Sequence, residues 1–146
     1  MDIIKSQRGV TFVEMLSVLF IVMCLSAIVI KYSVKAEETR EIERFFTQIQ
    51  LDIQYIQTYS MHKREYISIK FEGSSKRYII KKDFYTELYE RPFPKGVEVV
   101  LSSSSINTII YNYNGNVMTP GTVYFKTPQG TKKVVITLGR GRSRVE

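Results

Sequence analysis

The sequence predicts an α+β protein in which one long N-terminal helix packs on an antiparallel β-sheet. Three observations support this prediction. No proline or glycine interrupts residues 10–62, which favours a continuous helix. Apolar residues recur at helical spacing in the second half of this segment, whereas the residues after 62 alternate between apolar and polar, as strands do. Such strands leave an apolar face, and this helix is the amphipathic element available to cover it.

Composition argues against an enzyme. The chain has 146 residues, of which 44% are hydrophobic and 24% charged, so it is too apolar for a disordered protein and short enough for one ordinary domain. A single cysteine, Cys24, excludes an internal disulfide framework and a cysteine-based zinc site. A single histidine, His62, removes most histidine-based catalytic and metal sites. We therefore predict a protein with no catalytic residues, no metal site and no cofactor.

The first half of the helix is a candidate membrane span. Residues 10–30 form an apolar run of 21 residues, which as a helix is about 31 Å long. The hydrocarbon core of a bilayer is about 30 Å thick. Glu14 is the only charge in this run, and Lys5 and Arg8 precede it. We predict a transmembrane helix over residues 10–30 with the N-terminus in the cytoplasm.

Two ordinary interpretations of this apolar run leave Glu14 unexplained. A secretory signal peptide needs small residues at a cleavage site, and the stretch Ser33-Val34-Lys35-Ala36 after the run is only a poor match. A plain signal anchor explains the hydrophobicity. Neither explains a carboxylate within the span, five residues after Gly9.

The start of the run resembles a known processing signal. Residues 8–14, Arg-Gly-Val-Thr-Phe-Val-Glu, resemble the type IV prepilin signal, in which a short basic leader ends in glycine and a glutamate is fifth in the mature chain. The resemblance implies that a prepilin peptidase removes the leader, residues 1–9, by cutting between Gly9 and Val10, and that Val10 is then N-methylated. It also implies that Glu14 pairs with the terminal amine of a neighbouring subunit in a filament. Val10 departs from the phenylalanine that is usual at this position.

The second half of the helix, residues 31–62, is predicted to be amphipathic and to cover the sheet. Its apolar stripe comprises Ile42, Phe45, Phe46, Ile49, Ile53 and Ile56. The other face is assigned Glu37, Glu38, Arg40, Glu41, Glu43, Arg44 and Asp52. A β-rich domain over residues 63–146 follows, with strands expected at 66–71, 77–81, 97–101, 108–113, 122–126 and 133–138.

Two further stretches resemble one branch of this superfamily. They are Glu90-Arg91-Pro92-Phe93 with Gly96, and the ending Leu138-Gly139-Arg140-Gly141-Arg142 with Val145. They look like the ComGD-type minor pseudopilins of Gram-positive competence systems. The resemblance implies a structural subunit of a pseudopilus for uptake of exogenous DNA, held in the cell membrane before assembly and exposed at the cell surface afterwards. The alternatives are a minor pilin of a type IV pilus and a pseudopilin of a type II secretion system.

The same resemblance implies the partners. Sister pseudopilins would form the filament, a prepilin peptidase would process the chain, and a cytoplasmic ATPase with a membrane platform protein would drive assembly. The chain itself contains no phosphate-binding loop that could bind a nucleotide for this work. Cys24 is most simply a small apolar residue in helix packing.

A net charge of +7 favours an anionic partner but does not identify which one. The basic residues are concentrated in residues 63–82 and 126–146, within the predicted β-rich domain. They are candidate phosphate contacts for DNA, with Tyr78, Tyr111 or Tyr113 available to stack on unpaired bases. The candidate contacts are Lys76, Arg77, Lys81, Lys132, Lys133, Arg140, Arg142 and Arg144. The alternative is a hydrated surface that meets acidic neighbouring subunits or teichoic acids, with the Gly-Arg ending forming a turn.

Overall fold

The computed structural model of the chain describes residues 11–82, 85–139 and 142–146. These residues fall into two compact units, one up to Thr39 and one from Arg40 to Glu146. The predicted cleavage residues Gly9 and Val10, and the predicted DNA contact Arg140, lie outside the described residues.

Helix α1 extends over Phe12–Lys63 and so contributes to both units. Thr11 caps its start, because the Thr11 carbonyl and hydroxyl oxygens both accept from the Glu14 N–H, at 3.0 and 3.4 Å. The helix ends where Arg64 adopts a left-handed conformation with φ of 54°. There the Glu65 N–H donates to the Ser60 carbonyl at 3.3 Å, which satisfies one of the last helical carbonyls.

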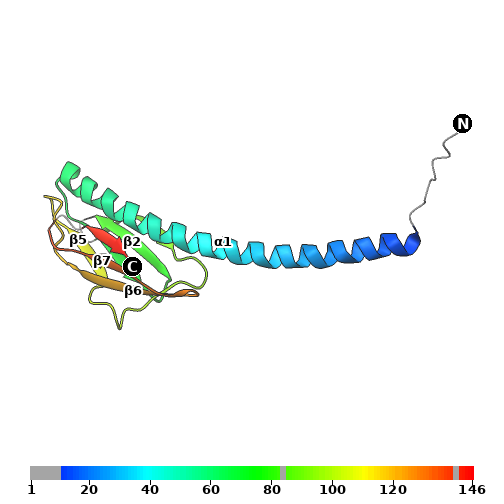
Figure 1. Cartoon of the computed structure of the whole chain (residues 1–146). Helices are drawn as coiled ribbons and strands as arrows, with labels where there is room; N and C mark the ends of the chain where they lie inside the picture. The colour runs from blue at the N-terminus through cyan, green and yellow to red at the C-terminus, as the bar shows by residue number, and fades with distance from the viewer. Residues whose placement is uncertain (1–10, 83–84, 140–141) are drawn as a thin grey trace, which may run out of the picture. The chain divides into compact units, whose positions relative to one another are not determined.

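Eight strands follow the helix, and they form two antiparallel sheets of four strands each. The first sheet has the order β3-β2-β1-β5 and the second the order β4-β6-β7-β8. Figure 1 labels β2 and β5 of the first sheet and β6 and β7 of the second. Single bridges from Val117 to Tyr111 and to Gly139 lie outside these strands. The strand bounds are β1 Ile67–Glu72, β2 Arg77–Lys82, β3 Thr86–Pro92, β4 Glu98–Val99, β5 Thr108–Tyr111, β6 Gly121–Thr127, β7 Gly130–Ile136 and β8 Ser143–Val145.

The predicted fold class is confirmed, but the details of the sheet are corrected. Two sheets replace the single one expected, and strands β3 and β8 were not predicted. Strand β3 forms an edge of its sheet and most of its side chains are exposed, so it lacks the buried alternation that marks a strand in sequence. Strand β8 is only three residues long. Strand β4 is also shorter than expected, with two residues of the predicted 97–101.

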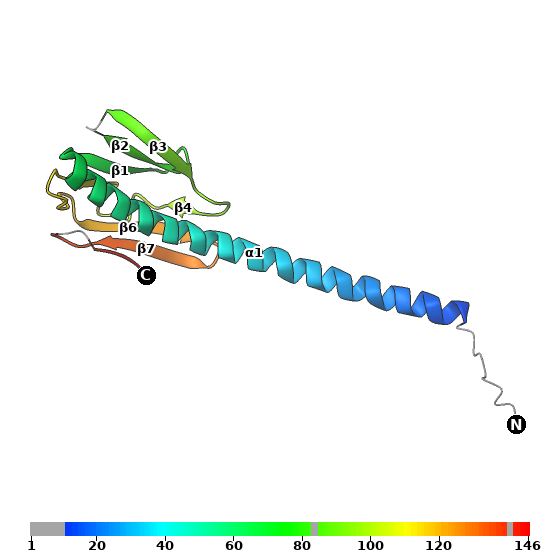
Figure 2. The same cartoon turned by 90° about the horizontal axis from the view of Figure 1, so that it is seen from above.

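The core lies between α1 and the two sheets. Figure 2 shows the second half of α1 crossing between β1, β2 and β3 on one side and β6 and β7 on the other. The predicted apolar stripe is confirmed, because all six of its residues are buried. Phe125 of β6 makes edge-on ring contacts with Phe45 and Phe46 of the helix, with ring centres 6.2 and 5.4 Å apart. One helical face therefore unites both sheets.

The serine-rich loop at residues 102–105 attaches to the edge of β6. The Ser104 hydroxyl accepts from the Tyr124 N–H at 2.9 Å and donates to the Val100 carbonyl at 2.7 Å. The Ser105 hydroxyl accepts from the Thr122 N–H at 2.8 Å. These side chains take the place of a partner strand, which gives the serine run a structural role.

Candidate assembly helix, polar cluster and basic surface

The first unit presents an exposed apolar helix. Every large apolar side chain from Phe12 to Ile30 is 50% exposed or more, and Phe12 itself is 78% exposed. An 18-residue window of α1 has a mean hydropathy of 2.6, so the helix is long and apolar enough to cross a bilayer. This surface is too large and too continuous for a protein that stays in water. Lipid or other apolar helices would cover it.

Glu14 is the one charged residue within this apolar surface. Its side chain is exposed, and none of the described basic residues forms an ion pair with it. It lies in the first turn of α1, where the helix dipole favours a negative charge. The carboxylate is therefore open to a cation from another molecule. The predicted assembly contact of Glu14 stays a prediction.

The second unit contains a buried polar cluster around Asp52. The sequence pattern predicted Asp52 on the solvent face of the helix, and this prediction is wrong, because Asp52 is only 4% exposed. One carboxylate oxygen accepts from Gln48 Nε2 at 2.9 Å. The other accepts from the Tyr78 hydroxyl at 2.6 Å and from Arg91 Nε at 2.8 Å. The buried charge is thus paired and hydrogen-bonded, as burial of a carboxylate requires.

This cluster joins the helix to the first sheet. Asp52 is on α1, whereas Tyr78 is on β2 and Arg91 is on the edge strand β3. Burial, together with the hydrogen bond to Asp52, raises the pKa of Tyr78 far above its ordinary value. Burial and the nearby Asp52 charge likewise raise the pKa of Tyr89. Both phenols therefore stay protonated, and Tyr78 remains a hydrogen-bond donor.

The Glu90-Arg91-Pro92-Phe93 stretch has a structural explanation at the end of β3. Arg91 reaches Asp52, and Glu90 forms an ion pair with Arg77 on the neighbouring strand. Phe93 packs edge-on against Phe45, with ring centres 5.5 Å apart. The stretch therefore fastens the edge strand and its following loop to the helix.

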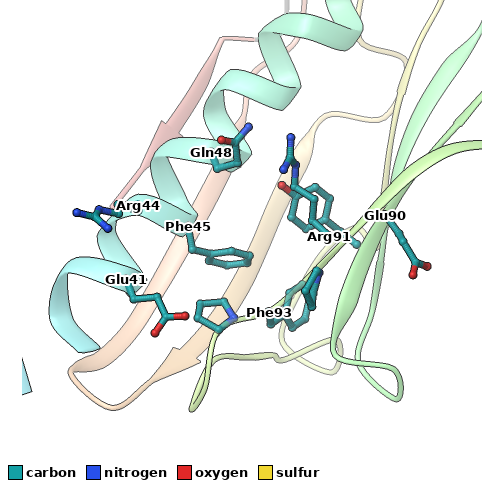
Figure 3. A pocket seen from close by; sticks show the side chains of 10 residues that line it. Glu41, Arg44, Phe45, Gln48, Glu90, Arg91 and Phe93 are labelled. Carbon is teal, nitrogen blue, oxygen red and sulfur yellow. The ribbon is translucent and has the colours of Figure 1, made fainter. Parts of the chain in front are cut away.

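A pocket of about 410 Å³ opens beside this cluster, between α1 and the end of β3 (Figure 3). The Phe45 and Phe93 side chains lie toward its centre, and Gln48 and Arg91 lie beside it (Figure 3). Arg44 and Glu90 point away from the centre. Charges of both signs surround the pocket.

Most of the predicted DNA contacts are engaged within the chain. Lys76 lies 2.7 Å from Glu98, Lys81 lies 3.0 Å from Glu87, and Arg77 pairs with Glu72 and Glu90. Lys133 and Arg144 both pair with Glu146. Hydrogen bonding from Lys76 lowers the pKa of Glu98, and that from Lys133 lowers the pKa of Glu146. These exposed pairs are weak, yet they neutralise much of the predicted phosphate-binding charge.

Two predicted contacts have no such neutralising partner. Among the described residues, neither Lys132 nor Arg142 has a carboxylate within ion-pair distance. The Lys132 ammonium lies over the Phe46 ring, 5.2 Å from its centre. Arg142 is exposed and lines a cavity of about 650 Å³ that also includes Gln54 and Asn114. The eight predicted residues therefore do not form one uniform basic surface.

Two of the three tyrosines proposed for base stacking are unsuitable. Tyr78 and Tyr111 are both fully buried, so neither can offer a ring face to a nucleic acid. Burial raises the pKa of Tyr111 to about 12. Tyr113 is 48% exposed and remains accessible. The two tyrosines differ because β5 ends at Tyr111, so Tyr113 lies beyond the strand and does not follow its alternation.

The last strand, β8, follows the glycine- and arginine-rich ending. Gly139 has φ of 91°, a conformation that favours glycine. The Thr137 N–H donates to the Arg142 carbonyl at 3.2 Å, and β8 then pairs with β7. The structure thus supports the alternative in which this ending covers a sheet edge.

Comparisons with known proteins agree with this architecture. No protein-family model matches the chain, and no curated protein sequence matches it significantly. Among solved structures, the type IV minor pilin FimU of Pseudomonas aeruginosa is similar, with a TM-score of 0.56 and 14% sequence identity. The similarity covers 75% of this chain and 89% of that one. The long N-terminal helix packed on antiparallel sheets is therefore the fold of a type IV pilin.

Proposed function

We propose that this chain is a minor pilin-like subunit of a type IV filament system, and specifically a minor pseudopilin of a competence apparatus for DNA uptake. The observation that carries the first part is the exposed apolar helix with a single carboxylate, Glu14, in its first turn. Such a helix suits two successive environments, a bilayer before assembly and the packed helices of a filament afterwards.

The proposed order of events is the one that the resemblance of residues 8–14 to the type IV prepilin signal implies. The leader, residues 1–9, is removed on the cytoplasmic side between Gly9 and Val10, and Val10 is methylated. The new amino terminus and Glu14 then bring opposite charges into an apolar surrounding. Each is costly there when alone, and a pair between neighbouring subunits offsets both costs and sets their register.

The competence assignment rests on the resemblance of the Glu90–Phe93 stretch and of the Gly-Arg ending to ComGD-type pseudopilins. The pilin fold is shared by a type IV pilus minor pilin and a type II secretion pseudopilin, which are the alternatives. Transformation by exogenous DNA in a deletion strain distinguishes them. We expect the competence subunit to be required for transformation, and unimpaired transformation would contradict that assignment alone.

Processing at Gly9 tests the proposal most directly. We expect the membrane-bound chain, produced together with a prepilin peptidase, to lack residues 1–9 and to carry one methyl group on Val10. Intact mass and N-terminal sequencing measure both features. Gly9→Leu should prevent the cut, because a bulky side chain hinders approach of the protease to the backbone.

Each alternative interpretation of the apolar run predicts a different N-terminus. An N-terminus beyond Ile30 would indicate a secretory signal peptide, and an uncut chain would indicate a plain signal anchor. Either result would contradict the filament subunit proposed here.

Direct DNA contact is a second proposal, favoured by Arg142, which is exposed and has no ion-pair partner among the described residues, and by the exposed Tyr113. We expect DNA affinity of the full chain in detergent to fall steeply with salt. Charge reversal at Arg140, Arg142 and Arg144 should lower the slope of log affinity against log salt by about 1 for each phosphate that the chain no longer neutralises. Fluorescence anisotropy with labelled DNA measures this, with Lys63→Glu as a control remote in sequence. No binding near physiological salt would dismiss the proposal.

A further inference from the structure

Four lysines gather at one end of the β-rich unit, and we call this set the basic end: Lys76, Lys95, Lys126 and Lys132. Contacts between residues adjacent to these lysines hold the three segments that carry them at the same end. The Phe93 N–H donates to the Lys76 carbonyl at 2.7 Å, which joins the loop containing Lys95 to the β1–β2 turn. That loop also approaches the turn between β6 and β7, since a Cβ at Gly96 would lie 2.8 Å from Pro128. Lys126 and Lys132 are in the two strands flanking this turn.

The basic end has a surplus of positive charge. Two nearby residues are acidic. Glu98 lies opposite Lys126 in the sheet and forms an ion pair with Lys76, and Glu41 lines a pocket together with Phe93 and Pro94, which precede Lys95. Among the described residues, no carboxylate lies within ion-pair distance of Lys95, Lys126 or Lys132. Lys95 and Lys126 are exposed, whereas Lys132 is half-buried over the Phe46 ring. At least two ammonium groups are therefore free to meet an external anion.

The chain leaves this unit at the same end. Phe45 contacts Phe93 and Phe46 contacts Lys132, so this part of α1 lies beside the basic end. The unit begins at Arg40, only a few residues earlier. The apolar run ends at Ile30, and the helical rise from Ile30 to Arg40 is about 15 Å. The unit that carries the basic end therefore begins ten residues after the end of the apolar run.

We propose that the basic end docks on anionic lipid headgroups before the subunit enters a filament. These headgroups belong to the outer leaflet of the membrane that residues 10–30 span. This inference rests on the proposed function, because it requires residues 10–30 to span the bilayer. Anionic headgroups attract lysines within a Debye length, about 8 Å at physiological salt. The connecting residues 31–44 carry four basic and four acidic side chains, so they add no net charge of their own. The selective attraction therefore comes from the β-rich unit.

Energy transfer between the full chain and labelled lipid tests this docking. The exposed Gln129 lies in the turn between β6 and β7, so Gln129→Cys in a Cys24→Ser chain places a donor dye at the basic end. The chain is reconstituted into vesicles carrying an acceptor on the headgroups and labelled from outside. We expect more transfer in vesicles containing phosphatidylglycerol than in pure phosphatidylcholine. High salt should remove the difference, because it screens the attraction.

Charge removal distinguishes the basic end from the rest of the surface. Lys95→Gln with Lys126→Gln should lower the ratio of docked to undocked units by about 25-fold, since one lysine near an anionic surface contributes about 5-fold. Lys132 is kept because it packs on Phe46. The matched control is Lys63→Gln with Arg64→Asn at the C-terminal end of α1, where asparagine tolerates the left-handed backbone of residue 64. This control should leave the transfer unchanged.

Three results would overturn the docking. The first is equal transfer in neutral and anionic vesicles, and the second is an equal loss in the control variant. The third is transfer between donor- and acceptor-labelled chains in neutral vesicles that depends on Lys95 and Lys126, which would assign the basic end to a second copy. Release of the unmodified chain by an alkaline carbonate wash would instead refute the membrane span and thereby the proposed function.

Discussion

Glu14→Ala is expected to leave the chain in the membrane and to exclude it from the filament. Removing a carboxylate from an apolar helix makes insertion easier, by up to about 3 kcal/mol for a central position. In the filament the same change leaves a neighbour's terminal amine buried without a partner, at a cost of about 3–5 kcal/mol. Incorporation should therefore fall by on the order of 100-fold or more.

Comparison of membrane and sheared surface fractions by immunoblot measures both effects of Glu14→Ala. Ser17→Ala is the matched control, because Ser17 is also an exposed polar residue on this helix and its hydroxyl donates only to the Val13 carbonyl of the same helix, at 2.9 Å. The control should enter the filament normally. Recovery of Glu14→Ala in the sheared fraction at the level of the unmodified chain would show that the carboxylate is not the assembly contact.

Asp52→Ala is expected to destabilise the β-rich unit by about 2–4 kcal/mol. The change leaves the fully buried Tyr78 hydroxyl without its acceptor. Arg91 is partly exposed and can turn to water, so the loss should lie below that of a fully buried ion pair. For a unit of this size the melting temperature should fall by about 10–20 °C. The tyrosine signal in near-ultraviolet circular dichroism, measured on the full chain in detergent, follows this transition.

Two further variants separate the role of Asp52 from a general effect of charge on the helix. Glu43→Ala removes an exposed carboxylate from the same helix and should change stability by less than about 0.5 kcal/mol. Combining Asp52→Ala with Tyr78→Phe removes both the acceptor and the donor. The double variant should lose less than the sum of the single losses. Strict additivity would mean that the hydrogen bond between Asp52 and Tyr78 does not stabilise the fold.

For Asp52, helical periodicity and residue type predict opposite sides of the helix. Asp52 lies three residues after Ile49 and four before Ile56, the spacing of the buried stripe itself. Spacing alone therefore pointed inward, whereas residue type pointed outward, and the prediction followed residue type. The deciding information was the presence of Tyr78 and Arg91 opposite, on strands that are 26 and 39 residues away in the sequence.

Strand β3 and the ion pairs of the basic residues, both at the surface, also depend on contacts that are distant in the sequence. An edge strand with mostly exposed side chains has no apolar alternation, so Thr86–Pro92 could be recognised only from its pairing with β2. Formal charge likewise predicted a surface of eight phosphate contacts. Acidic partners such as Glu87, Glu90 and Glu146 occupy most of these side chains, and their proximity depends on strand register.

The sequence by itself determined the long helix, the apolar stripe that covers the sheets, the exposed apolar run with Glu14, and the α+β class. These features follow from composition and periodicity, which act through neighbouring residues along one element. Only the tertiary structure decided that there are two sheets, that Asp52 is buried, which tyrosines are inaccessible, and which lysines remain unpaired. These features depend on contacts between elements, where the partner of a charge or a hydroxyl is distant in sequence and is set by packing and strand register.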